Sequence, residues 1–512
     1  MAEDKGRKRF VRGGLLPRAL DLVERWGNSL PHPFSLFVLF SFGVLVLSWI
    51  ASSLELSAIH PATGKKIAAV NLLDRQGFQN IITKTVSNFT GFAPLGTVLV
   101  AMIGVGVAER SGLFAAALKA LVAGVPSWLL TSALVFAGVN ASLAVDAGYV
   151  ILIPLGAVLF AGIGRHPIVG LAAAFAGVSG GFSANIFLTA LDPLLAGLTQ
   201  EAARLYDPNY TVAVTANYYF MIASTFLLTI IGTWVTVKIV EPRLGVYGGS
   251  GQKSLEKLRP EEKRGLATAG LTIALELLLL LLFISPANGL LRDAKGGLEP
   301  LFQGMVTLMA IGFLLPGLAY GSAAGTIKSD RDSGKMLEET MGTMGSYIAL
   351  AFAASQFVAY FGWSNLGLIL AINGANLLKA SGLSGVSLII LFIFVCALID
   401  LFLASASAKW AVIGPVFVPM LMIMGYSPEV TQAAYRIGDS FTNIVTPLMP
   451  YMPLVIAFAQ KYEPKMGLGT LLAMMLPYSI AFAISWTLLL AVWLLLGIPL
   501  GPGASLAYPP VR

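Results

Sequence analysis

An arginine and an aspartate lie between long apolar runs of this 512-residue chain, in an otherwise membrane-like region. Arg436 and Asp439 belong to the segment YRIGDSFTNIVTPLMPYMP, which runs from Tyr435 to Pro453. A charged side chain at the centre of a membrane helix costs roughly 2.5–3.5 kcal/mol on insertion scales, so such residues point to function. The spacing of three residues places both side chains on one helix face.

Two roles are open for this pair. The guanidinium of Arg436 offers a planar fork of donors that suits a substrate carboxylate, while Asp439 is a candidate for handling substrate or a proton. Alternatively, the two residues neutralise each other as an ion pair that only allows the segment to enter the membrane. Both roles can apply in different states of the protein.

The residues that follow predict a break in this helix. Pro447, Pro450 and Pro453 come directly after Asn443, and proline removes a backbone donor and clashes with the preceding turn. Broken helices at membrane depth occur where the freed backbone is buried in protein or lines a cavity. In transporters, such breaks form the substrate site.

Asp192 is a second candidate, in the segment SANIFLTALDPLLAG that begins at Ser183. A carboxylate in a low-dielectric cavity disfavours its charged form, which suits a group that gains and releases a proton. The alternative is that Asp192 is the N-cap of a helix beginning at Pro193. Either role places the side chain at a helix break.

The segment SASAKW offers groups that suit an aromatic substrate. Trp410 can stack on an aromatic ring, and Ser407, three residues earlier, can donate a hydrogen bond from the same side. The alternative is a packing or interfacial tryptophan. Lys409 reaches either water or a substrate carboxylate.

Neutral oxygens at the predicted breaks are possible ligands for Na⁺, although Asn and Thr in membrane helices also hydrogen-bond neighbouring helices. These candidates are Asn185, Thr189, Asn443 and Thr446. Three further acidic residues have no role assigned from sequence, namely Asp146, Asp400 and Glu276. The single cysteine and three dispersed histidines predict no metal site.

Composition determines the class of protein in which these residues act. The chain is 56% hydrophobic and 12% charged with mean hydropathy +0.80, against about 45–50% apolar and about 25% charged residues in soluble domains. This predicts an all-α polytopic membrane protein, because barrel strands would alternate in polarity over about ten residues. Apolar stretches long enough to span a bilayer include 33–56, 212–240, 265–285, 301–320, 386–403 and 467–496.

The net charge of +7 follows from basic residues in the first 30 positions and in the segment 241–264. The positive-inside rule places both segments in the cytoplasm, so nucleic acid is not needed to explain them. Basic residues in the loop 57–88 weaken this orientation without reversing it.

Two pairs of segments suggest an internal repeat. NASLAVDAGYVILIPLGA (140–157) aligns with LFLASASAKWAVIGPVFVP (401–419) at a shift of 261, and Asn185 aligns with Asn443 at a shift of 258. We therefore predict two inverted repeats, each with a re-entrant helical hairpin and a broken helix. The predicted units are a basic tail (1–30), a first half (31–240; hairpin about 126–160, broken helix about 168–200), a linker (241–264), a second half (265–498; hairpin about 386–424, broken helix about 429–460) and a C-terminal tail (499–512).

Three long segments carry a family resemblance. SANIFLTALDPLLAGLTQEA (183–202), SASAKWAVIGPVFVPM (405–420) and YSPEVTQAAYRIGDSFTNIVTPLMPY (426–451) resemble the aminobenzoyl-glutamate transporter (AbgT) family. The resemblance implies a homodimer in the bacterial inner membrane, each subunit with about nine spanning helices and two re-entrant hairpins. It also implies import of p-aminobenzoyl-glutamate, or efflux of p-aminobenzoate-like compounds including sulfonamides. The functional positions that the resemblance implies are Asp192, Ser407, Trp410, Arg436, Asp439 and Pro447.

Together these features predict a secondary active transporter that works by alternating access, with the p-aminobenzoyl ring against Trp410 and the glutamyl carboxylate near Arg436. We favour H⁺ over Na⁺ as the coupling ion and expect no other cofactor. One alternative is a sodium-coupled transporter of a dicarboxylate-like anion, since the breaks distantly resemble those carriers. Another is a passive channel, which rings of one charge would favour. An enzyme is not expected, because no nucleophile and base are paired in the sequence.

Overall fold

The structure of the protein is a computed structural model. The described residues are 31, 33–61, 63–123, 125–144, 148–245, 258–286, 288–403 and 405–508. The predicted basic tail, Asp146 and half of the predicted linker (246–257) therefore lie outside the described residues. Apart from one short two-stranded hairpin, the regular structure in these ranges is helical, so the predicted all-α membrane fold is confirmed.

The first half of the chain begins with a long helix, continues through the β-hairpin, and then consists of helices of variable length. Its elements are α2 (Pro33–Ser53), β1 (Ser57–Ile59), β2 (Lys66–Ala68), α3 (Arg75–Thr90), α4 (Ala93–Arg110), α5 (Leu113–Ala123), α6 (Leu130–Asn140), η1 (Ala141–Ala144), η2 (Gly148–Leu152), α8 (Ile153–Gly162), α9 (Pro167–Phe175), η3 (Ala176–Gly180), α10 (Leu191–Arg204), α11 (Tyr218–Val235), η4 (Thr236–Val240) and α12 (Glu241–Leu244).

The second half is helical throughout its regular structure and ends with the 28-residue helix α23. Its elements are α13 (Pro260–Ile284), α14 (Glu299–Gln303), α15 (Met305–Ala324), α16 (Asp330–Thr343), α17 (Gly345–Trp363), α18 (Leu366–Ala380), α19 (Gly385–Asp400), α20 (Ala406–Ile423), α21 (Pro428–Thr442), α22 (Met452–Gln460) and α23 (Leu468–Leu495).

Seven helical stretches of the described chain are long and apolar enough to cross a membrane, or eight if α16 and α17, bent by 41°, form one span. Five of the predicted spans are among them: α2, α11 with its continuation to Leu244, α13, α15 and α23. The predicted span at 386–403 is wrong in length, because α19 has only 16 residues and a bilayer needs roughly 17–25. The remaining two stretches are α3 with α4, and α20.

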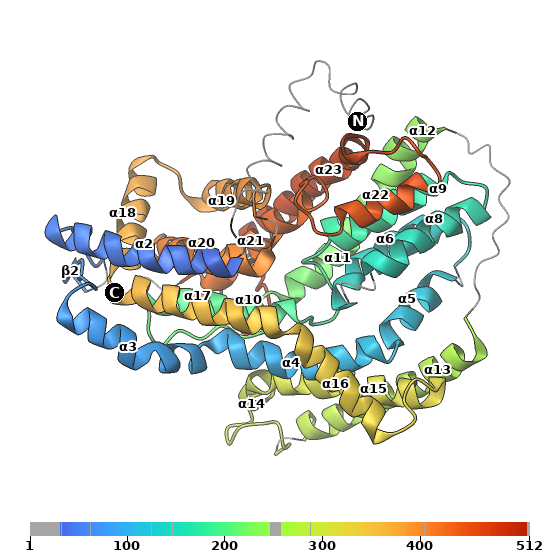
Figure 1. Cartoon of the computed structure of the whole chain (residues 1–512), viewed down its shortest axis with the longest axis horizontal. Coiled ribbons are helices and arrows are strands. Elements are labelled where there is room, and N and C mark those ends of the chain that lie inside the picture. Colours follow the sequence, from blue (N-terminus) through green and yellow to red (C-terminus); the bar gives the residue numbers. More distant parts are fainter. Residues whose placement is uncertain are drawn as a thin grey trace, which may run out of the picture.

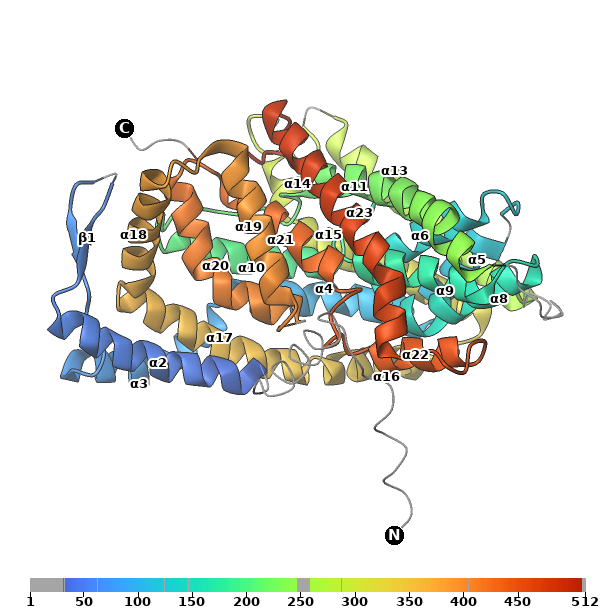
Figure 2. The same ribbon diagram turned by 90° about the horizontal axis from the view of Figure 1, so that it is seen from above.

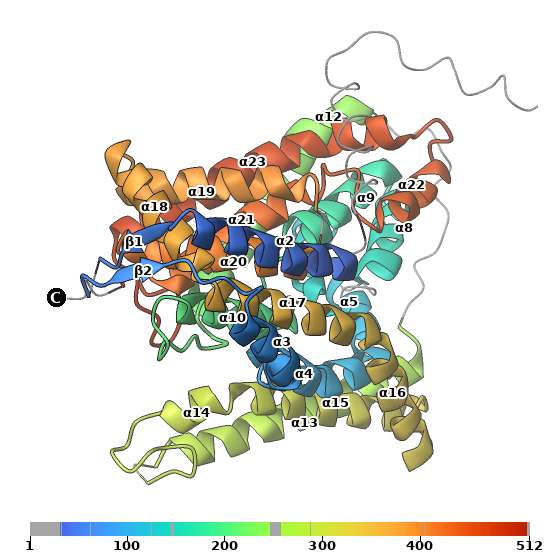
Figure 3. The same cartoon turned by 60° about the vertical axis from the view of Figure 1, so that its left-hand side comes forward.

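One group of helices forms a separate layer with its own apolar core. Helix α4 packs against α15 and α16, and α15 packs against α13, as seen along the lower edge of Figure 3. Glycines allow these close contacts, since a Cβ at Gly104 would collide with the backbone of Ala310 and one at Gly317 with the backbone of Ala108. Small residues at such interfaces let membrane helices approach closely.

The main core contains two similar arrangements of a helix pair followed by an interrupted helix. In the first half, α6 and α8 precede α9 with η3, an irregular segment at 181–190, and α10. In the second half, α19 and α20 precede α21, an irregular segment at 443–451, and α22. These two irregular segments are called the first break and the second break below.

The two halves exchange contacts at these breaks. The helix after the first break, α10, packs on α20 of the second half, and the helix after the second break, α22, packs on α8 and α9 of the first half (Figure 1). Figure 2 shows α19, α20 and α21 close together, with α23 crossing the molecule beside α19 and α21. Residues from both halves therefore meet between α10 and α21.

Candidate functional site

Arg436 is paired with Asp192 across the two halves. The Nη2 atom of Arg436 lies 2.6 Å from Oδ1 of Asp192, and its Nη1 donates to the carbonyl of Ser183 at 3.4 Å. Only 2% of Arg436 and 6% of Asp192 is exposed. Removing one partner of such a buried pair typically costs about 3–5 kcal/mol. The alternative that Arg436 and Asp439 neutralise each other is wrong in this structure, because Arg436 faces α10.

The position of Asp192 differs from the predicted cap. Helix α10 begins at Leu191 after Ala190, so Asp192 lies in the first turn and is not the N-cap residue. Its Oδ2 accepts hydrogen bonds from the backbone N–H of Thr189 at 2.6 Å and from the Thr189 hydroxyl at 3.0 Å. A carboxylate is favoured at this end of the helix dipole. Asp192 therefore holds Arg436 with one oxygen and the first break with the other.

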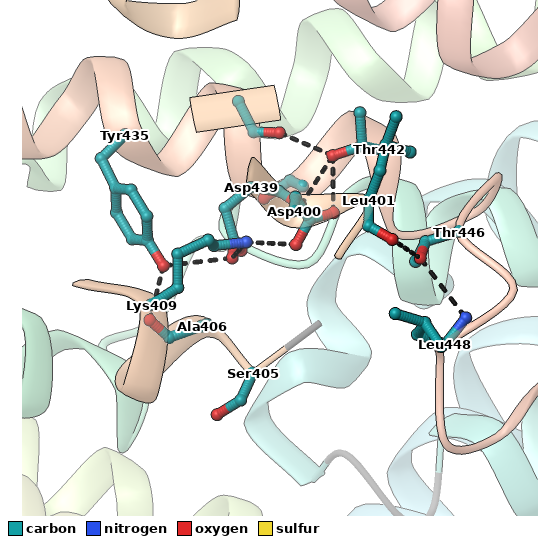
Figure 4. A network of polar contacts seen from close by, with 12 residues as sticks. Asp400, Leu401, Ser405, Ala406, Lys409, Tyr435, Asp439, Thr442, Thr446 and Leu448 are labelled. Carbon is teal, nitrogen blue, oxygen red and sulfur yellow. Dashed lines mark hydrogen bonds and ion pairs between the residues drawn. The ribbon is translucent and has the colours of Figure 1, made fainter. Parts of the chain in front are cut away.

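A second charged cluster lies beside this pair. The Nζ atom of Lys409 on α20 is in direct contact with Asp400 at the end of α19 and lies 2.8 Å from Asp439 on α21 (Figure 4). The Thr442 hydroxyl donates to Oδ2 of Asp400 at 2.6 Å, and the Tyr435 hydroxyl lies 3.2 Å from Oδ1 of Asp439. We call Asp400, Lys409 and Asp439 the charge cluster.

The charge cluster corrects two expectations and adds a residue. Lys409 does not reach water, since its side chain and that of Asp400 are 0% exposed. Asp439 is bound by this lysine rather than by Arg436. Asp400 had no role assigned from sequence, although an acidic residue that ends an apolar run nine positions before a lysine was a usable signal.

A glycine brings the cluster together. A Cβ on Gly438 would lie 2.5 Å from the carbonyl oxygen of Ile393 and 2.7 Å from Cβ of Cys396, so α21 and α19 approach more closely than larger residues permit. The next residue along α21 is Asp439, and α19 ends at Asp400. This close contact places the two carboxylates on either side of Lys409.

Trp410 is a packing residue in this conformation. Its ring is 0% exposed and stacks on Tyr435 with centroids 4.3 Å apart and planes at 24°. Its Nε1 donates to the Thr199 hydroxyl on α10 at 2.9 Å, and that hydroxyl lies 2.7 Å from Oε1 of Gln432. Stacking of Trp410 on a substrate ring remains a prediction.

Ser407 and Pro447 lie at the edges of the site. Ser407 is half-buried in the first turn of α20, where its hydroxyl is 3.5 Å from that of Ser405. Pro447 is half-buried in the second break, where it keeps the chain out of a continuous helix.

The four candidate ion ligands divide between the two breaks. Asn185 donates to the Asn140 carbonyl at 3.2 Å and to Ser142, so it joins the first break to the end of α6. The Thr446 hydroxyl donates to the Leu401 carbonyl at 3.2 Å and makes the equivalent connection in the second half. Of the other two candidates, Thr189 binds Asp192, and Oδ1 of Asn443 is buried with no hydrogen-bond partner among the described residues.

A polar cavity of about 300 Å³ lies away from these groups, between α3, α10 and α17. It is lined by Glu201 and Arg204, and the latter is twelve residues after Asp192, or about 18 Å along the helix. The ion pair and the charge cluster are themselves closely packed, with no charged residue more than 6% exposed.

Residues 18–508 match the AbgT putative transporter family. The chain belongs to the AbgT family. This AbgT chain is 38% identical over 484 residues to the p-aminobenzoyl-glutamate transport protein of Escherichia coli (strain K12). The alignment covers 94% of this chain and 95% of the E. coli protein. The resemblance seen in the three sequence motifs is thereby confirmed.

Two solved AbgT-family structures share the fold. The YdaH transporter of Alcanivorax borkumensis is 47% identical with a TM-score of 0.88, over 92% of this chain and 100% of that structure. MtrF of Neisseria gonorrhoeae, described as illuminating a class of antimetabolite efflux pumps, is 47% identical with a TM-score of 0.89, over 95% of this chain and 100% of that structure. The protein is therefore a polytopic membrane transporter.

Proposed function

We propose that this protein is a secondary active transporter of p-aminobenzoyl-glutamate or related p-aminobenzoate-type compounds, including sulfonamides, driven by a proton gradient. The observation that carries the proposal is the buried pair of Arg436 and Asp192, which joins the two halves at the first break. A substrate carboxylate has the same chemistry as Asp192 and competes with it for the guanidinium.

Unused donors support an anionic, amide-containing substrate. Nε of Arg436 and Nε2 of Gln432 are buried with no hydrogen-bond partner among the described residues. The two residues are four positions apart and share one face of α21. Buried polar groups are normally paired, so unpaired donors beside an ion pair suit a carboxylate and an amide carbonyl.

The same pair provides a route to alternating access. Asp192 is held by Thr189 as well as by Arg436, so it keeps hydrogen-bond partners when Arg436 turns to a substrate carboxylate. Exchange of the partner removes a buried link between α10 and α21, which belong to different halves. Substrate binding thereby changes the contacts that hold the halves in one arrangement.

The test is uptake of labelled p-aminobenzoyl-glutamate and a labelled sulfonamide by proteoliposomes, with proton and sodium gradients imposed separately. We expect flux that responds to the proton gradient. A response to sodium alone favours the second candidate function, a sodium-coupled anion transporter. The neutral side-chain oxygens of Asn185 and Asn443 at the breaks are the candidate Na⁺ ligands for that function. No flux of either compound overturns the proposed substrate class.

We also propose a homodimer in the bacterial inner membrane, as the family resemblance implies, with its N-terminus in the cytoplasm, as the positive-inside rule predicts. Helix α13 presents most of its apolar side chains outward, as expected for contact with lipid or a second subunit. Mass measurement in detergent tests the dimer. Labelling of single cysteines in a Cys396→Ala background tests the orientation, since Cys396 is the only cysteine in the sequence.

A further inference from the structure

The charge cluster has an unbalanced charge. Asp400 and Asp439 contribute two negative charges and Lys409 one positive charge, which leaves one net negative charge if all three are ionised. The cluster is at most 1% exposed. An isolated charge in such surroundings is strongly disfavoured, and a buried group takes up a proton rather than remain unpaired.

The neighbouring groups supply no second cation. The other titratable side chains that face the cluster are Cys396 on α19, Tyr435 on α21 and Tyr149 on η2. A thiol or a phenol cannot carry a positive charge. Arg436 is on the same helix as Asp439, but its guanidinium binds Asp192. Among the described residues, Lys409 is therefore the one cation within 4 Å of these two carboxylates.

One carboxylate oxygen of the cluster is also unused. Oδ1 of Asp439 contacts Lys409 and Tyr435, whereas Oδ2 is buried and has no hydrogen-bond partner among the described residues. Both oxygens of Asp400, in contrast, are engaged by Lys409 and Thr442. The geometry provides a free carboxylate oxygen at the point of excess negative charge.

We propose that the coupling proton of the transport cycle binds to the charge cluster, shared between Asp400 and Asp439, and that α21 links its occupancy to the substrate site. The proposal rests on the proposed function and specifies its ion site. The proton arrives from one aqueous side, forms an O–H bond with a carboxylate oxygen, and leaves to the other side. No bond of the substrate is made or broken.

The link to substrate follows from α21. Arg436 and Asp439 are one turn apart on this helix, so a shift of α21 that moves Arg436 from Asp192 to a substrate also moves Asp439 relative to Lys409. Such a movement changes the contact between Lys409 and the two carboxylates, and a proton on the carboxylate pair removes a negative charge that holds Lys409. Coupling between two binding sites is reciprocal, so each event promotes the other.

The decisive variant is Asp400→Asn, which keeps the shape of the side chain and leaves the cluster neutral without a bound proton. Reconstituted full-length protein is given a gradient of one pH unit with the membrane potential clamped at zero. One coupled proton then supports about tenfold accumulation of p-aminobenzoyl-glutamate, because one unit of pH corresponds to a factor of ten. We expect about tenfold accumulation by the wild type and none by Asp400→Asn.

Counterflow separates this proposal from the proposed function. Exchange of labelled for unlabelled substrate without any gradient requires the substrate site and alternating access but no net proton movement. We expect measurable counterflow in Asp400→Asn. Absence of counterflow in the wild type would contradict the proposed function. About tenfold accumulation by Asp400→Asn would contradict only the assignment of the proton to this cluster.

A matched control and a second readout complete the test. Glu276→Gln removes a lone carboxylate on α13, outside the cluster, and should accumulate substrate like the wild type. If Asp400→Asn does not fold, Asp439→Asn is used in the same assays. Infrared spectroscopy of the wild type should show a protonated carboxyl band that changes when p-aminobenzoyl-glutamate is added, and a spectrum without such a change contradicts the proposal independently of any variant.

Discussion

Arg436 and Asp439 are one turn apart on α21, yet they bind partners on two different helices. Arg436 contacts Asp192 of α10 at 2.6 Å, and Asp439 contacts Lys409 of α20 at 2.8 Å. The helix therefore carries two electrostatic links side by side. One reaches into the first half of the chain, and the other remains within the second half.

Arg436→Lys should reduce transport of p-aminobenzoyl-glutamate by at least about tenfold, because an ammonium keeps the charge but loses the planar fork of donors. Protein yield and melting temperature should change little, since lysine still pairs with Asp192. Proteoliposome flux is the measurement. The matched control is Arg264→Lys, whose side chain is 71% exposed, and near-normal flux in Arg436→Lys would leave only a charge-balancing role for Arg436.

The pair of Asp192 and Arg436 should show energetic coupling in a double-mutant cycle. Asp192→Asn and Arg436→Gln each leave a buried charge without its partner, whereas the double variant removes both charges. We expect a coupling energy within the range of about 0.5–3 kcal/mol seen for contacting residues. Thermal unfolding in detergent measures it. Additive losses would mean that the contact contributes nothing to stability.

Trp410→Ala should destabilise the protein by about 3–5 kcal/mol, the usual cost of emptying a buried aromatic site. Trp410→Phe keeps a ring against Tyr435 but loses the hydrogen bond to Thr199, which is worth about 1 kcal/mol. Unfolding measurements separate the two effects. Substrate affinity decides the role of the ring, because a pure packing residue predicts equal affinity in wild type and Trp410→Phe.

Gly438→Ala should destabilise the protein by about 1–3 kcal/mol, as expected when a methyl group is forced into a packed contact. The new Cβ would meet the Ile393 carbonyl and move α21 away from α19, which separates Asp439 from Asp400. We expect lower gradient-driven uptake and a lower melting temperature. Gly312→Ala on α15 is the control, because a Cβ there has no heavy atom within 4 Å, and equal effects of the two substitutions would contradict the packing argument.

The sequence by itself determined the class of the protein and most of its local structure. Its apolar runs predicted five of the seven stretches in the described part of the chain that are long and apolar enough to span, because lipid selects for apolar residues over a length that the bilayer sets. The prolines and asparagines predicted where helices are interrupted, because proline acts on the backbone of its own segment. The cost of burying charge also singled out Arg436, Asp439 and Asp192 as unusual.

Only the tertiary structure decided which charges are partners. The spacing of Arg436 and Asp439 allowed a contact on one helix, but packing of α10 and α20 against α21 supplied other partners, 244 positions away for Arg436. Asp400 gained significance for the same reason, since Gly438 brings its helix against α21. Local patterns record the preferences of a segment, whereas ion pairing depends on distances between segments that only the packed fold establishes.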